Sequence, residues 1–123
     1  MGSNEKLSLS SEVRADLSDA DLTSAKLTRA KLNFSSLKNA VLTGATLRDA
    51  ILSNTDLRGA ISNFADFNGA LLSFSDLTGA DLSGAKFDSA NLTKAIVAQI
   101  QLDMACGTNV KLDLGLGIKP CLH

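Results

Sequence analysis

Cys106 and Cys121 are the residues with the clearest capacity for covalent chemistry, because the 123-residue chain has no other cysteines. They enclose a short glycine-containing segment close to the C-terminus. In the loop-entropy account, a disulfide across such a segment stabilises a fold by about 3 kcal/mol. The even count favours a disulfide and an oxidising, extracytoplasmic compartment such as the periplasm, with two free thiols as the alternative.

Other groups that could do chemistry are scarce. His123 is the only histidine and the last residue, so a Ser-His-Asp or Cys-His arrangement would depend on the chain end. The sequence has no Cys-x-x-Cys pair for a metal, and Lys119 lacks the spacing and the following Ser or Thr of a phosphate-binding loop. We therefore predict no catalytic residues, no metal site, no cofactor and no enzymatic activity.

Carboxylates are plentiful, but they recur at fixed positions within a repeat that runs from Ala15 to Ala95. Every fifth residue from Leu17 to Leu92 is Leu or Phe, which we call the central position, and Ser62 is the one exception. Two residues before each centre lies Ala, Ser or Thr. The acidic residues mostly precede the centre, where we interpret them as a solvated face whose oxygens cap turns.

A period of five excludes both simple elements. On an α-helix, each leucine would advance by roughly 140° and surround the axis. On a continuous strand, successive leucines would point to opposite faces. A short extended piece places the small and the central residue on one side. The residue two past the centre, often Gly, Asn, Asp or Ser, then suits a bend, so the pattern predicts a turning coil.

Exceptions within the repeat indicate how many sides one coil has. The departures from Ala at the small position are Ser35, Thr55 and Ser75, which are spaced 20 apart, and Phe67 and Phe87 are also 20 apart. Four repeats per coil would place each set in one column. We expect the buried hydroxyls to hydrogen-bond along their column.

This pattern resembles the pentapeptide-repeat family, whose consensus of small, Asp/Asn, Leu/Phe, Ser/Thr/Arg and Gly or polar residues recurs over about two-thirds of the chain. The resemblance implies an all-β, right-handed quadrilateral β-helix. We expect about four and a half coils with caps at both ends. Residues 1–14 are interpreted as a tag remnant and N-terminal cap, 15–104 as the solenoid, and 105–123 as a C-terminal cap holding the cysteine pair. Similar Cys-Gly…Pro-Cys endings occur on some exported bacterial members, which suggests a bacterial-type protein.

The outward surface supplies the only candidate binding site. Ile51 and Leu71 stack on one side, and Phe34 and Phe74 occupy the turn position on that side, with Asn54 between them. An exposed apolar patch with aromatic residues is a candidate interaction face. The alternative is that the outer face of a β ladder simply tolerates apolar residues.

Two functions follow from these observations. The first is a non-enzymatic structural or protein-binding module, expected to be monomeric, with an unidentified protein partner and no direct contact with nucleic acid or membrane. The second comes from the resemblance: some family members imitate DNA and inhibit a type II topoisomerase through columns of acidic residues, and Asp56 and Asp76 would stack here. A net charge of −1 argues against this mimicry, because a mimic must compete with phosphate.

Ser62 should mark an irregularity in the core. It replaces a leucine between Leu42 and Leu82 in its column, and would leave a void in a densely packed stack. We predict that Phe64 folds over or into this corner, or that the strand bulges there to bring Phe64 inward. The alternative is an inward Ser62 beside a water or a small cavity, with Phe64 exposed.

Overall fold

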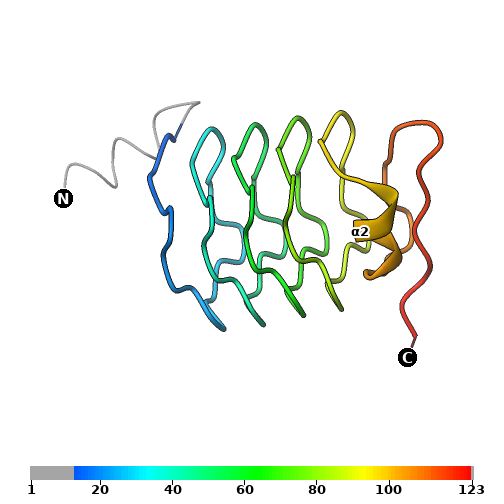
Figure 1. Cartoon of the computed structure of the whole chain (residues 1–123), viewed down its shortest axis with the longest axis horizontal. Coiled ribbons are helices and arrows are strands. Elements are labelled where there is room, and N and C mark those ends of the chain that lie inside the picture. The colour runs from blue at the N-terminus through cyan, green and yellow to red at the C-terminus, as the bar shows by residue number, and fades with distance from the viewer. Residues whose placement is uncertain (1–12, 123) are drawn as a thin grey trace.

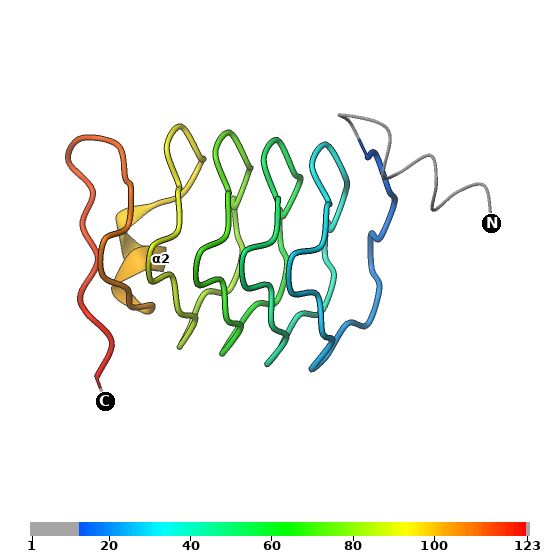
Figure 2. The ribbon, with the colours of Figure 1, turned by 180° about the vertical axis from the view of Figure 1, so that it is seen from behind.

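The computed structural model describes residues 13–122, so the predicted tag remnant and most of the predicted N-terminal cap lie outside the described residues. The chain winds through successive coils stacked along one axis, with the first described coil and the C-terminal segment that follows α2 at opposite ends of the stack (Figure 1). The same stack seen from behind shows the coils side by side along their whole length (Figure 2). The sides of each coil are too short to form longer strands and are joined by single parallel bridges.

The bridges show that each coil contains four repeats. They join residues 20 apart throughout, from Asp16 with Ser36 to Asn91 with Lys111. At each bridge the central residue donates to the next coil, as when Leu57 N donates to Asp76 O at 2.8 Å. The bridge residue of that next coil donates back, as when Asp76 N donates to Thr55 O at 3.0 Å. This reciprocal pairing satisfies the backbone of neighbouring coils.

The turns are where the sequence places them. The residue two past each centre has a positive φ, for example +64° at Asp19, +60° at Asn39 and +66° at Gly44. The next residue then donates its backbone N–H to the central carbonyl, as Ala40 N does to Leu37 O at 3.0 Å. Glycine adopts this backbone without strain, and Asp and Asn tolerate it better than most residues.

The interior holds the central and small residues. Most central leucines from Leu37 onward and the alanines beside them are fully buried. Phe67 and Phe87 stack in parallel on the axis, with ring centroids 4.9 Å apart and an interplanar angle of 3°. Burying each leucine should contribute roughly 1.5–3 kcal/mol, so this stack is the main source of stability.

The buried hydroxyls bond to the backbone rather than to one another. Ser35 Oγ accepts from Ala15 N at 2.9 Å, Thr55 Oγ1 donates to Leu32 O at 2.9 Å, and Ser75 Oγ donates to Leu72 O at 2.6 Å. Two of these bonds join neighbouring coils. The expectation that the hydroxyls are buried in one column is confirmed, but their partners are carbonyl and amide groups at the turns.

The prediction that Phe64 fills the space beside Ser62 is wrong. Ser62 is fully buried, its Oγ has no hydrogen-bond partner, and Phe64 is 68% exposed. The ladder stays in register here, since Ser62 N donates to Asp81 O and Phe64 N to Ser83 O, both at 2.8 Å. The positive φ of 61° at Phe64 then directs its side chain outward. A bulge would have broken these bonds.

Parallel bridges also occur in residues 105–123, the segment predicted to be the C-terminal cap. Helix α2, Gln99–Asp103, replaces one side of the last coil and keeps Leu102 buried, and the bridges then resume from Lys86 to Cys106. The predicted disulfide between Cys106 and Cys121 is present, with a Cα–Cα distance of 4.8 Å. It holds the final segment beside the last coil, where Gly107 N donates to Lys119 O at 2.8 Å. The total coil number and the extent of the caps stay predictions.

Candidate protein-binding face

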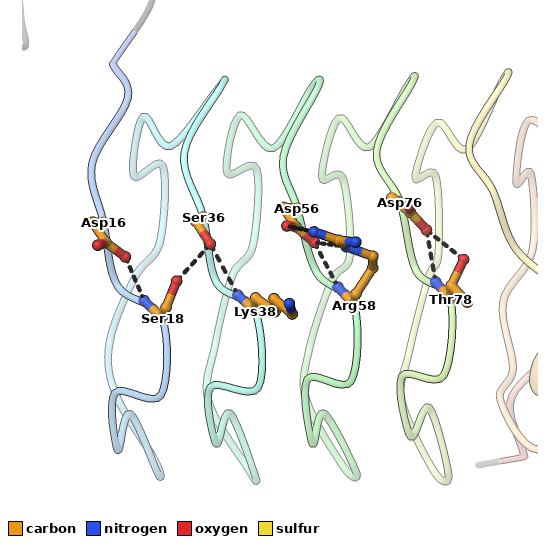
Figure 3. A network of polar contacts seen from close by, with 8 residues as sticks. All are labelled: Asp16, Ser18, Ser36, Lys38, Asp56, Arg58, Asp76 and Thr78. Atoms are coloured by element: carbon orange, nitrogen blue, oxygen red, sulfur yellow. Dashed lines mark hydrogen bonds and ion pairs between the residues drawn. The ribbon is translucent and has the colours of Figure 1, made fainter.

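The acidic residues before the centre close their own turns. Asp16 Oδ1 accepts from Ser18 N at 3.0 Å, and Asp76 Oδ1 accepts from Thr78 N at 3.0 Å (Figure 3). Each carboxylate therefore bonds to the backbone amide two residues further on, as expected for Asp in turns. This geometry explains the recurrence of Asp at this position without any ligand.

These bonds lower the pKa values of several carboxyl groups. Hydrogen bonds from Ser18 and Thr23 hold the pKa values of Asp16 and Asp21 below their ordinary value of 3.8. The Arg58 guanidinium does the same to the pKa of Asp56, chiefly by a hydrogen bond to its carboxylate. Hydrogen bonds to the ionised form always act in this direction.

The acidic column is not a continuous negative strip. Asp16, Ser36, Asp56 and Asp76 succeed one another along this side, and Arg58 Nη2 lies 2.7 Å from Asp56 Oδ2 (Figure 3). The guanidinium therefore neutralises one of the three carboxylates. A surface that imitates the phosphates of DNA needs a stronger negative field than this column supplies.

A metal-binding grouping is not found among residues 13–122. This range has no cluster of three or more His, Cys, Asp or Glu side chains that could hold a metal ion. Both cysteines are used in the disulfide, and His123 lies outside the described residues. No helix within the described range has the length and apolarity to cross a membrane.

The candidate interaction face, formed by Phe34, Ile51, Leu71 and Phe74, is assembled as the repeat register requires. Ile51 and Leu71 pair through a parallel bridge, and Leu71 is 42% exposed. Phe34 and Phe74 are 39% and 62% exposed at turn positions with φ of 64° and 63°. The two aromatic side chains therefore stand at the corner beside the apolar pair.

A hollow of about 370 Å³ lies between the two rings. Its lining combines two aromatic residues with polar and charged ones: Phe34, Asn54, Thr55, Asp56, Arg58, Phe74 and Asp76. The Arg14 guanidinium carbon lies 5.5 Å from the centre of the Phe34 ring. The corner thus joins the apolar face to the acidic side drawn in Figure 3.

Sequence reasoning missed two apolar features. The first is the exposed ring of Phe64, for which the sequence predicted an interior position. The second is a largely apolar groove of about 420 Å³ beside α2, where Ile96 and Ile100 are 57% and 75% exposed. The loss of the five-residue pattern after Ala95 was the signal for the second feature, but it did not reveal a helix.

Comparison with solved structures places this architecture among known proteins. A pentapeptide repeat protein from the Arabidopsis thaliana thylakoid lumen is 28% identical with a TM-score of 0.66, and the match covers 84% of this chain and 69% of that one. QnrB1, a plasmid-mediated fluoroquinolone resistance protein, is 25% identical with a TM-score of 0.44, over 80% of this chain and 57% of that one. The protein Rfr23 from the cyanobacterium Cyanothece 51142 is 24% identical with a TM-score of 0.37, over 95% and 97% of the two chains. The last two TM-scores are too low to support any argument.

The family comparison agrees with the fold. No curated protein matches the chain. The family model for pentapeptide repeats matches in 8 copies, over residues 13–33, 25–61 and 64–97. Together with the thylakoid-lumen structure, this match implies a right-handed quadrilateral β-helix. The chain belongs to the pentapeptide repeat family.

Proposed function

We propose that this protein is a non-enzymatic binding module that holds a protein partner against the face formed by Phe34, Ile51, Leu71 and Phe74. The observation that carries the proposal is the exposure of Phe74 and Leu71, at 62% and 42%, together with a hollow of about 370 Å³ that Phe74 lines. Binding surfaces are enriched in aromatic residues that fill pockets of the partner. The fold makes this face rigid, because each of its residues lies on a paired coil.

The rigidity lowers the entropic cost of binding. Phe74 N donates to Thr93 O at 3.2 Å, and Leu71 N donates to Ala50 O at 2.9 Å, so the backbone under the face is already ordered. A preordered surface loses little freedom when the partner docks. This property suits a binding module without requiring any catalytic group.

We further propose that the protein acts outside the cytoplasm as a monomer. The disulfide between Cys106 and Cys121 favours an oxidising compartment. The similar protein from the Arabidopsis thylakoid lumen supports such a location.

Affinity capture with matched variants tests the binding face. Phe74→Ser and Leu71→Asn remove the apolar groups while keeping residue types that the repeat already accepts, since Ser89 and Asn91 occupy the same positions of other repeats. Phe64→Ser is the control, because Phe64 is equally exposed but lies on a different column. The proposal is supported if wild type and Phe64→Ser retain a partner that both face variants lose. The purified partner should then also bind wild type and Phe64→Ser more tightly than it binds the two face variants. Identical capture by all four proteins would refute it.

A further inference from the structure

We call the hollow lined by Phe34 and Phe74 the slot. The turn positions of the two phenylalanines are two coils apart in one column, so their backbones are separated by roughly 9.6 Å along the axis. Asn54 occupies the turn position between them and also lines the slot. A flat group in the slot would therefore lie over Asn54, with an aromatic side chain on either side.

The charges of the slot favour a cation. Arg58 bonds to both oxygens of Asp56, at 2.9 Å to Oδ1 and 2.7 Å to Oδ2, so these two charges balance. The hydrogen bonds to Asp76 come from Thr78, a neutral residue of its own turn, and Asp76 interacts with Arg58 only through space. The lining thus keeps one net negative charge, next to two aromatic faces whose electrons also attract cations.

The structure already shows one of these rings holding a guanidinium. Arg14, one coil before Phe34 in the same column, lies over the ring at 5.5 Å from its centre. This distance is within the range of a cation–π contact. The remaining side of the column, toward Asn54 and Phe74, lines the slot.

From these observations we infer that the slot receives the guanidinium of an arginine on the protein partner, between Phe34 and Phe74 with Asp76 as counter-ion. The inference rests on the proposed function, since it names the group that this face recognises. Arginine fits better than lysine because its planar group stacks on aromatic rings and forms two hydrogen bonds at once. An apolar side chain would take water from Asp76 without replacing its hydrogen bonds, which is unfavourable.

An NMR titration with short peptides tests the inference on the whole protein. The probe is acetyl-Gly-Arg-Gly-amide, and the control is the same peptide with citrulline, which has nearly the same shape without the charge. The arginine peptide should shift the Asn54 side-chain amide and the backbone amides of Asp56 and Asp76, with saturation in the weak range expected of one side chain. The citrulline peptide should bind about two- to fivefold more weakly or not measurably.

Two pairs of variants locate the interaction. Asp76→Asn removes the charge but keeps the turn, because Asn91 caps Thr93 N in the same way at 2.9 Å. It should lower the affinity for the arginine peptide about two- to fivefold, and Phe74→Ser should do the same. Asp81→Asn changes the equivalent carboxylate on another side and Phe64→Ser an exposed ring on another column, so both should bind like wild type. Equal binding of the two peptides, or wild-type affinity in Asp76→Asn, would overturn the inference.

The titration and the capture experiment fail independently. A partner that depends on Phe74 and Leu71, combined with no preference for the arginine peptide, would overturn the arginine slot and leave the binding face in place. Preference for the arginine peptide with no face-dependent partner would support the slot and refute the proposed function.

Discussion

Two buried serines offer a direct test of how hydrogen bonding of polar groups in the core affects stability. Ser62 and Ser75 are both fully buried in the interior of the coils. Ser75 Oγ donates to Leu72 O at 2.6 Å, whereas Ser62 Oγ has no partner. The same substitution by alanine should therefore have opposite effects at the two positions.

The magnitudes follow from the hydrogen bonding. A buried polar group without a partner costs about 1–3 kcal/mol, so Ser62→Ala should raise the free energy of unfolding by about 1 kcal/mol after the small loss of packing. Ser75→Ala loses one hydrogen bond, worth about 0.5–1.5 kcal/mol. The Leu72 carbonyl would still accept from Ser75 N at 3.0 Å, so no orphaned acceptor adds to that cost. The two variants should differ by about 2 kcal/mol.

Guanidinium chloride unfolding followed by circular dichroism would measure the difference. The chain has no Trp and no Tyr, so intrinsic fluorescence is a poor probe. A stabilised Ser62→Ala and a destabilised Ser75→Ala, with equal denaturant dependence, would support the reasoning. If Ser62→Ala were destabilised as much as Ser75→Ala, Ser62 would have a partner in solution, and the account of an unsatisfied core hydroxyl would be refuted.

Three further outcomes are expected. Leu57→Ala, which removes a fully buried side chain, should lower the free energy of unfolding by about 2–5 kcal/mol in the same denaturation assay, and a loss under 1 kcal/mol would contradict the inside–outside assignment. Intact mass should show no alkylation of Cys106 or Cys121 before reduction, and reduction should cost about 3 kcal/mol; two alkylated thiols in a sample kept free of reductant would contradict the disulfide. The pKa of Asp56 is lowered in the folded state, so its contribution is present above pH 3.8 and is lost as the pH falls toward the folded value. Melting temperatures between pH 7 and pH 3 should therefore fall less steeply for Asp56→Asn than for wild type, and parallel curves would count against the Arg58 contact.

The interior of this protein could be predicted from its sequence because two residue separations define it. One is the repeat of five residues, and the other is the separation of 20 residues between equivalent positions of neighbouring coils. A repeat of five selects which residues face inward, and the exceptions at Ser35, Thr55 and Ser75 revealed the spacing of 20 that the bridges show. The stacked rings of Phe67 and Phe87 follow from the same spacing. Each of these predictions concerns residues whose neighbours are determined by the register of the repeat.

The features that sequence reasoning missed depend on hydrogen-bond and packing energies, which the register of the repeat does not determine. At Ser62 the choice lay between an unsatisfied hydroxyl and a bulge, and two backbone bonds of 2.8 Å on either side favour the regular ladder. Helix α2 forms where Gln101 Oε1 accepts from Ala98 N at 2.8 Å and Gln101 Nε2 donates to Leu77 O at 2.7 Å. The first of these bonds is local, but the second joins neighbouring coils, and a periodic pattern along the chain does not reveal such a contact. The residues of the candidate interaction face were identified from the register of the repeat. The identity of the partner could not be predicted, because it depends on the surface of another molecule.

The turn positions determine which exposed rings can form a binding slot. Phe64 and Phe74 are similarly exposed, at 68% and 62%, but their neighbours in the next coil differ. The ring of Phe64 packs against Gly84, where an added Cβ would come within 2.6 Å of the ring. The missing side chain of the glycine therefore leaves the space that the ring occupies. Phe74 is followed in its column by Lys94 and preceded by Asn54, so no glycine lies beside it. Its ring lines the hollow that Phe34 also lines, so we propose the column of Phe34 and Phe74, rather than the most exposed aromatic side chain, as the candidate interaction face.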